Sequence, residues 1–77
     1  MTDVVFPILA KERPEAEGVV STWFVDDGGT VAAGQRLAEA MVDKASVEVP
    51  APAAGVVHLL VAEEDAVTQG AVIAQIT

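Results

Sequence analysis

Lys44 is the residue whose type and position are most suited to chemistry on an exposed amine. It lies in the stretch Met41-Val42-Asp43-Lys44-Ala45-Ser46, between two segments that favour β-strands. Gly34, ten residues before it, and Gly55, eleven after it, mark the outer ends of a long hairpin. Asp43 favours a tight turn, because an Asp carboxylate can bond the backbone two residues on. We therefore expect Lys44 at a hairpin tip, although most exposed turn lysines serve solubility alone.

No other side chains form a predicted catalytic or metal-binding group. The chain has one histidine, His58, and no serine, cysteine or carboxylate pair is placed by sequence to act with it. We expect His58 on the surface of a strand. The absence of cysteine excludes disulfides, and a structural zinc site is not expected with a single histidine. We predict neither a metal site nor enzymatic catalysis by the chain itself.

Size and charge limit the function classes further. The 77 residues predict one small domain over 1–77, stabilised by an aliphatic core, since 52% of residues are hydrophobic. Four basic against twelve acidic residues give a net charge of -8, which argues against binding nucleic acid or anionic membranes. The charge favours solubility or partners with basic faces. No apolar run reaches the roughly 18 residues that span a bilayer, and Met1-Thr2-Asp3 does not begin a basic leader, so we expect a cytoplasmic location.

Alternating apolar residues and turn signals predict an all-β chain. The expected strands are Val4–Phe6, Gly18–Val25, Thr30–Val31, Arg36–Val42, Ser46–Pro50 and Gly55–Val61. Ala66-Val67, Thr68-Gln69-Gly70 and the segment from Ala71 to Ile76 close the chain. Asp26-Asp27-Gly28-Gly29 is the strongest turn signal. Residues 8–17 form a charged segment, in which Pro14 argues against a long helix.

The second half of the chain repeats the first. The matched positions are Gly18-Val19-Val20 with Gly55-Val56-Val57, Val31 with Val67, Gly34 with Gly70, and Leu37-Ala38 with Ile73-Ala74. The difference in residue number between matched positions falls from 37 to 36, which predicts that the acidic turn 63–65 is one residue short. Upstream, Phe6-Pro7 is matched with Val49-Pro50. A repeated β-meander without a helix predicts two antiparallel sheets related by a pseudo-two-fold axis, in a flattened barrel or sandwich.

This symmetry predicts which segment lies beside the lysine. A two-fold axis that exchanges the halves also exchanges the hairpin tip with the region of the chain ends. The strand that ends at Pro50 runs away from the tip, so its counterpart that ends at Pro7 runs toward it. Loop 8–17 is therefore expected next to Lys44.

With these features together, the sequence resembles the lipoyl domain of the 2-oxo acid dehydrogenase complexes, from Val4 to Ile76. The residues that carry the resemblance are Gly18, Trp23-Phe24-Val25, Gly28, Val31, Gly34, Leu37-Ala38-Glu39, Asp43-Lys44-Ala45, Val47-Glu48-Val49-Pro50, Pro52, Gly55-Val56-Val57, Gly70 and Ile76. The resemblance implies a non-catalytic carrier whose Lys44 bears lipoic acid in amide linkage, flanked by Asp43 and Ala45. Such a domain is part of, or partner to, a dihydrolipoamide acyltransferase component.

The resemblance also implies a set of partners. They are a thiamine-diphosphate 2-oxo acid dehydrogenase, an acyltransferase core, a flavin-dependent dihydrolipoyl dehydrogenase, and a lipoate ligase or lipoyl transferase. In such complexes the chain would be either one lipoyl domain of a longer acyltransferase or a separate lipoyl carrier.

The alternative is a biotin carrier domain of a carboxylase, which is similar in fold. Its lysine usually lies between two methionines, and Glu39-Ala40-Met41 is similar to the residues that precede it. That similarity is out of register, because it would put Val42 at the lysine position. Lys44 lies between Asp43 and Ala45 instead, which favours lipoate.

Two departures from the family bear on partner choice. Loop 8–17 is longer than its usual counterpart and carries several charges. Met41-Val42 stands where a polar pair is common, so either it exposes apolar surface near the tip or one of the two side chains turns inward. The predicted recognition residues are Glu12, Arg13, Met41, Val42 and Asp43.

Overall fold

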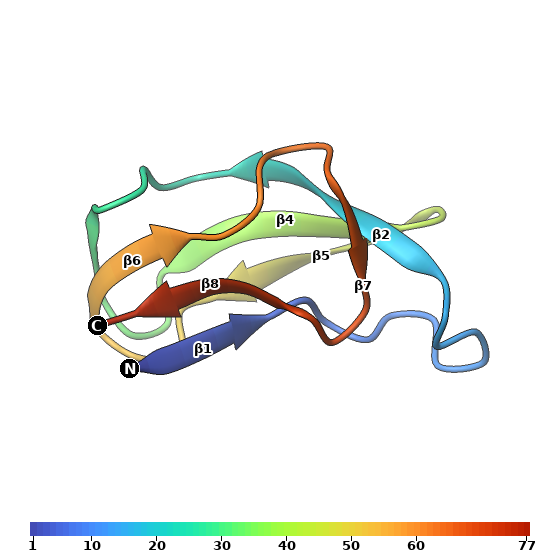
Figure 1. The fold of residues 1–77 in the computed structure, drawn as a ribbon, viewed down its shortest axis with the longest axis horizontal. Helices are drawn as coiled ribbons and strands as arrows, with labels where there is room; N and C mark the ends of the chain where they lie inside the picture. Colours follow the sequence, from blue (N-terminus) through green and yellow to red (C-terminus); the bar gives the residue numbers. More distant parts are fainter.

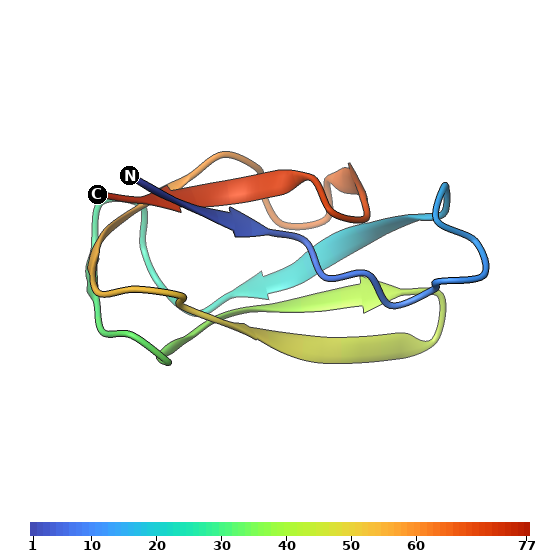
Figure 2. The same ribbon diagram turned by 90° about the horizontal axis from the view of Figure 1, so that it is seen from below.

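The structure, a computed structural model that describes residues 1–77, consists of strands and turns without a helix. The strands are β1 (Thr2–Val5), β2 (Glu17–Trp23), β3 (Thr30–Val31), β4 (Arg36–Val42), β5 (Ala45–Pro50), β6 (Gly55–Leu59), β7 (Ala66–Thr68) and β8 (Val72–Ile76). They form two four-stranded antiparallel sheets, in the orders β1-β8-β6-β3 and β5-β4-β2-β7. The two sheets stack as layers (Figure 2), which confirms the predicted flattened sandwich. No helix capable of spanning a membrane is present.

The predicted repeat is confirmed by the strand order. Exchanging β1 with β5, β2 with β6, β3 with β7 and β4 with β8 converts one sheet into the other. Individual hydrogen bonds obey the same exchange. The amide of Phe24 donates to the carbonyl of Leu37 at 2.8 Å, and the amide of Leu60 donates to the carbonyl of Ile73 at 2.9 Å. The pseudo-two-fold axis therefore relates the backbone in detail.

The predicted match of Phe6 with Val49 is wrong by two residues. The amide of Gly34 donates to the carbonyl of Ala51, and the amide of Gly70 donates to the carbonyl of Phe6, both at 2.8 Å. Ala51 is therefore the counterpart of Phe6. The connection that follows is ten residues long in the first half (8–17) and only two in the second (53–54). The difference between the two loops is larger than the sequence match implied.

The extra residue of the first half also lies elsewhere than predicted. β2 pairs Val20 with Ala40 and then Thr22 with Glu39, so Ser21 is an unpaired bulge. Its counterpart, β6, pairs with β8 without interruption. The Ser21 hydroxyl donates at 3.2 Å to the Glu39 carbonyl and lies 3.0 Å from the Glu39 carboxylate. The offset changes at this bulge rather than at the acidic turn.

Strands β2 and β6 each end two residues before their predicted limits, at Trp23 and Leu59. The Trp23 amide donates to the Glu63 carboxylate at 2.8 Å, and the Leu59 amide donates to the Asp27 carboxylate at 2.8 Å. A carboxylate of the opposite half thus accepts a hydrogen bond from the last residue of each strand. The acidic turn of each half therefore stabilises the end of a strand in the other half.

The core is aliphatic, as the composition predicts. It contains sixteen buried residues, of which Phe6, Leu37 and Ile73 are the largest that are fully buried. The molecule is elongated, with extents of 34 × 18 × 17 Å. Both termini lie at one end, whereas loop 8–17 and the β4–β5 turn lie at the other (Figure 1). β1 runs toward that second end, as the symmetry predicts.

Candidate carrier-lysine site

Lys44 lies in a two-residue turn between β4 and β5. Val42 pairs with Ala45, so only Asp43 and Lys44 lie outside the ladder. Asp43 has φ +54°, a left-handed conformation that Asp adopts more readily than most residues. The Lys44 side chain is exposed, and its amine makes no ion pair. The turn therefore presents an unpaired amine to solvent at the end of the long axis.

The residues just before the turn anchor it to the core. Val42 is buried, with 2% of its surface exposed, whereas Met41 is half-buried. β2 can approach this strand closely because Gly18 has no side chain: a Cβ there would lie 2.4 Å from the Met41 carbonyl oxygen. Val42 is thus the residue that turns inward. Its side chain is not available to a partner, which corrects its place among the predicted recognition residues.

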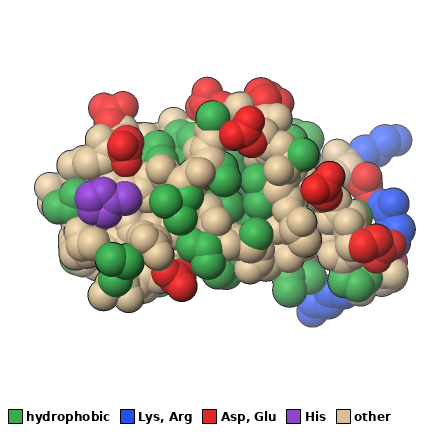
Figure 3. All heavy atoms as spheres, viewed as in Figure 1, with side chains coloured by type: hydrophobic (Ala, Val, Ile, Leu, Met, Phe, Trp, Pro, Cys, Tyr) green, Lys and Arg blue, Asp and Glu red, His purple; other side chains and the backbone are tan.

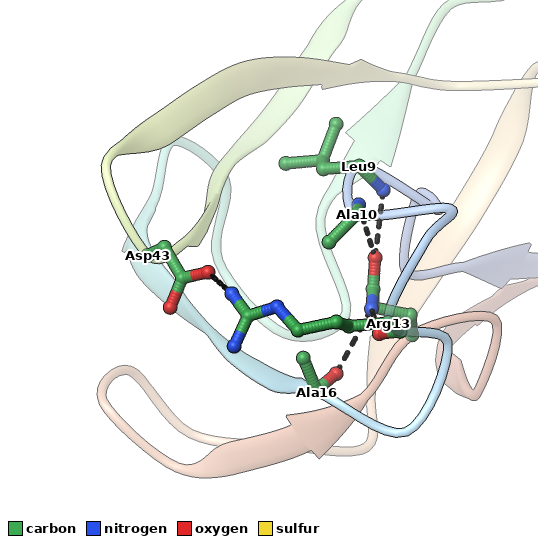
Figure 4. Close-up of polar contacts among 6 residues, drawn as sticks. Leu9, Ala10, Arg13, Ala16 and Asp43 are labelled. Carbon is green, nitrogen blue, oxygen red and sulfur yellow. Dashed lines mark hydrogen bonds and ion pairs between the residues drawn. The ribbon is translucent and has the colours of Figure 1, made fainter.

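Loop 8–17 lies beside the turn, which confirms the prediction made from the repeat. The Arg13 guanidinium donates through Nη2 to Oδ2 of Asp43 (Figure 4). The two side chains are 53% and 57% exposed, so the pair is open to water. Glu12, also a predicted recognition residue, is exposed in the same loop. The structure thus brings Arg13, Asp43 and Lys44 together.

A buried glutamine holds this loop, and sequence reasoning missed it. Gln69 Oε1 accepts hydrogen bonds from the amides of Leu9 and Ala10, both at 2.8 Å. Gln69 Nε2 donates to the carbonyls of Arg13 and Ala16, both at 3.0 Å (Figure 4). In sequence Gln69 is one of several polar residues in a turn signal. Its partners are more than 50 residues away, and no local pattern marks them.

Three of the four basic residues gather at the lysine end of the molecule. Blue side chains project there in Figure 3, whereas acidic side chains occur along the visible face. Lys11 and Arg13 come from loop 8–17, and Lys44 comes from the turn. The remaining basic residue, Arg36, begins β4 and pairs with Glu48 at 2.5 Å. The lysine end is therefore close to electrically balanced, while the rest of the molecule carries most of the negative charge.

The surroundings of Lys44 form an open surface. No pocket is found in the molecule, and no group of three or more potential metal ligands occurs. His58 is exposed on β6, as predicted, and its Nε2 lies 3.1 Å from the Thr77 hydroxyl. An attachment to the Lys44 amine would thus extend into solvent without a cavity to receive it.

Comparison with known proteins defines the class. Residues 3–76 match the biotin/lipoyl family, described as "Biotin-requiring enzyme". The chain therefore belongs to the family of biotin- and lipoyl-attachment domains. It superposes on the solution structure of the lipoyl domain of the 2-oxoglutarate dehydrogenase complex from Azotobacter vinelandii with a TM-score of 0.80 and 28% identity, covering 100% of this chain and 96% of that one.

Sequence relatives narrow the likeness to lipoyl proteins. The chain is 41% identical over 76 residues to the dihydrolipoyllysine-residue acetyltransferase component of the pyruvate dehydrogenase complex of Corynebacterium glutamicum, which covers 97% of this chain. It is 41% identical over 62 residues, or 78% of this chain, to the component of the same name in Mycobacterium bovis. The chain spans only 11% of the length of each of these two proteins.

Proposed function

We propose that this chain is a lipoyl carrier whose Lys44 holds lipoic acid in amide linkage. The observation that carries the proposal is the Lys44 amine, which is exposed and unpaired at a two-residue turn at one end of the molecule. Asp43 and Ala45 flank it, and the relatives named above are lipoyl proteins. An amide bond removes the positive charge of the amine and leaves a neutral arm.

The residues at the turn fit such an attachment. The amine is free to be acylated, and no pocket competes for a long side chain. When bound, lipoic acid would supply a dithiolane whose S–S bond opens on taking up two electrons, so that one of its sulfurs can carry an acyl group. The chain's own contribution is positional: strands β4 and β5 hold the attachment point outward, and the core fixes the base of the turn. A tethered arm also raises its local concentration at each enzyme that it reaches.

The proposed partners are those of a 2-oxo acid dehydrogenase complex. A thiamine-diphosphate dehydrogenase would load the arm, an acyltransferase would unload it, and dihydrolipoyl dehydrogenase would reoxidise it. A lipoate ligase or lipoyl transferase would install it. In this proposal the chain itself catalyses none of these steps, and the cytoplasmic location expected from the sequence remains part of it.

The test is an intact-mass measurement on the 77-residue chain. The wild type and Lys44→Arg are each incubated with a lipoate ligase plus lipoate, and with a biotin ligase plus biotin. We expect one lipoyl group on the wild type and none on Lys44→Arg, which keeps the positive charge. A gain with biotin and none with lipoate would replace the proposal with a biotin carrier. A lipoyl group on Lys44→Arg would place the attachment at Lys11, the other lysine of the chain.

A further inference from the structure

The side-chain amide of Gln69 makes all of its hydrogen bonds to one loop. It is 8% exposed, and both its oxygen and its nitrogen make two hydrogen bonds. All four partners are backbone groups of loop 8–17. An amide side chain offers two donors and can accept at least two bonds, so the set leaves no donor unpaired. Gln69 thus fixes the path of a loop that has no strand ladder of its own.

The symmetry of the fold shows that the sandwich itself does not need this glutamine. At the 36-residue offset that relates Gly34 to Gly70, the counterpart of Gln69 is Ala33, which is exposed. The connection that corresponds to loop 8–17 has only residues 53–54 and requires no clamp. Gln69 therefore serves the longer loop, which is the part of the chain that reaches the Lys44 turn.

Arg13 connects the clamp with the turn. Its carbonyl accepts a bond from Gln69 at 3.0 Å, and its guanidinium pairs with Asp43. An exposed ion pair contributes little by itself, because holding two flexible side chains costs entropy. Restraining the backbone of Arg13 in advance lowers that cost. The Arg13–Asp43 pair is thus supported from inside the fold although both side chains face water.

We infer that Gln69 is a positioning residue for recognition at the Lys44 turn. By holding loop 8–17 it presets the Arg13–Asp43 pair, so an enzyme that docks there meets an ion pair rather than an isolated carboxylate. Arg13 keeps further guanidinium donors and Asp43 keeps Oδ1 for that contact. The matching surface of such an enzyme carries a hydrogen-bond acceptor for Arg13 and, beside it, a donor for Asp43. This inference rests on the proposed function, because docking is assigned to the enzymes that modify or use Lys44.

The first experiment needs no partner. Amide hydrogen exchange of Leu9 and Ala10 is compared in the wild type, Gln69→Ala and Gln35→Ala. Gln35 is the matched control, because its side chain accepts only from Ala32 within its own exposed turn. We expect faster exchange at both amides in Gln69→Ala alone. Unchanged exchange in Gln69→Ala would overturn the inference whatever is attached to Lys44.

The second experiment measures recognition by a purified lipoate ligase. The measured quantities are the KM and kcat of the ligase with each variant of the chain as its substrate. Gln69→Ala and Arg13→Gln should each raise KM by roughly two- to tenfold at unchanged kcat, the range expected for losing one preordered side chain. The double variant should be no worse than either single variant, since both changes act through the same Arg13–Asp43 pair. If the increase in KM of the double variant equals the product of the two single increases, the inference is overturned. An unchanged KM in Gln69→Ala would also overturn it. If the ligase modifies none of the variants, including the wild type, the proposed function fails instead, and the exchange experiment still decides the role of Gln69.

Gln69→Glu provides a second variant that separates the two halves of the clamp. A carboxylate still accepts from Leu9 and Ala10 but cannot donate to the carbonyls of Arg13 and Ala16. We expect retained protection of the two amides together with the raised KM of Gln69→Ala. A wild-type KM in Gln69→Glu would show that the bonds donated to Arg13 and Ala16 do not position the pair, and would overturn the inference.

Discussion

The ring of Phe6 lies against the backbone of Gly18. A Cβ on Gly18 would be 2.6 Å from Phe6 Cζ and 2.4 Å from the carbonyl oxygen of Met41. Phe6 is fully buried, at the point where the chain leaves β1 for loop 8–17. The contact brings together the start of this loop, the start of β2 and the end of β4 next to the Lys44 turn. It secures the base of the structure that presents Lys44.

Gly18→Ala should therefore destabilise the domain by about 1–3 kcal/mol, the usual cost of overpacking a core. The expected result is a lower midpoint in urea with an unchanged m-value. Adding Phe6→Leu should not restore stability, because the clash with the Met41 carbonyl is with backbone, which cannot move away alone. Full recovery in the double variant would show that the aromatic ring is the sole obstacle.

Asp43 should tolerate Asn and not Val. Its φ of +54° suits Asp and Asn, whereas a β-branched residue is strained there by roughly 1–2 kcal/mol. Asp43→Asn loses only an exposed ion pair, which is worth about 0–1 kcal/mol. Chemical denaturation of both variants in moderate salt checks the ranking. Equal losses would mean that the ion pair, and not the backbone, sets the stability of the turn.

Deleting Ser21 should leave a folded sandwich. The deletion converts the bulged β2 into the uninterrupted ladder that β6 already shows, at the expense of the Ser21 contacts with Glu39, about 1–2 kcal/mol in all. Deleting Val20 is the control, since it moves a serine into a fully buried position. Circular dichroism and thermal unfolding should show a cooperative transition for the first deletion and a much larger loss for the second.

Trp23→Phe should cost about 1–2 kcal/mol. Trp23 Nε1 donates to the carbonyl of Val61 at 3.1 Å in a partly buried contact between the halves. Phenylalanine keeps most of the apolar contact but leaves that carbonyl without this donor. Urea denaturation followed by circular dichroism measures the loss. Stability equal to the wild type would mean that water replaces the indole at no cost.

Patterns that act locally or by repetition were readable in the sequence. The alternation of residues, the glycines and the repeat predicted the strands β1 to β6, the two-layer arrangement and the position of loop 8–17 beside Lys44. The Lys44 turn was predictable because Asp43 has a strong local preference there. These features need only the period of a strand and the geometry of a two-fold axis.

Other features depend on contacts between distant segments, which the sequence does not display. Val49-Pro50 and Ala51-Pro52 are equally plausible matches for Phe6-Pro7, and only the hydrogen bond from Gly34 to Ala51 selects the second pair. In sequence, the extra residue Ser21 cannot be told from a residue missing in the other half. Only the pairing of β2 with β4 shows that it is a bulge. Gln69 is a turn glutamine in sequence, and its role depends on a loop folded over it.

The placement of both chain ends opposite the Lys44 turn sets the reach of this amine. Any segment joined to Met1 or Thr77 would leave from the far end, so pivoting about that junction would sweep the lysine through an arc whose radius approaches the 34 Å length of the domain. The rigid body then acts as a lever, and a flexible arm on the amine adds to its length. Shortening the sandwich would shrink the volume searched even if every residue around the turn stayed the same.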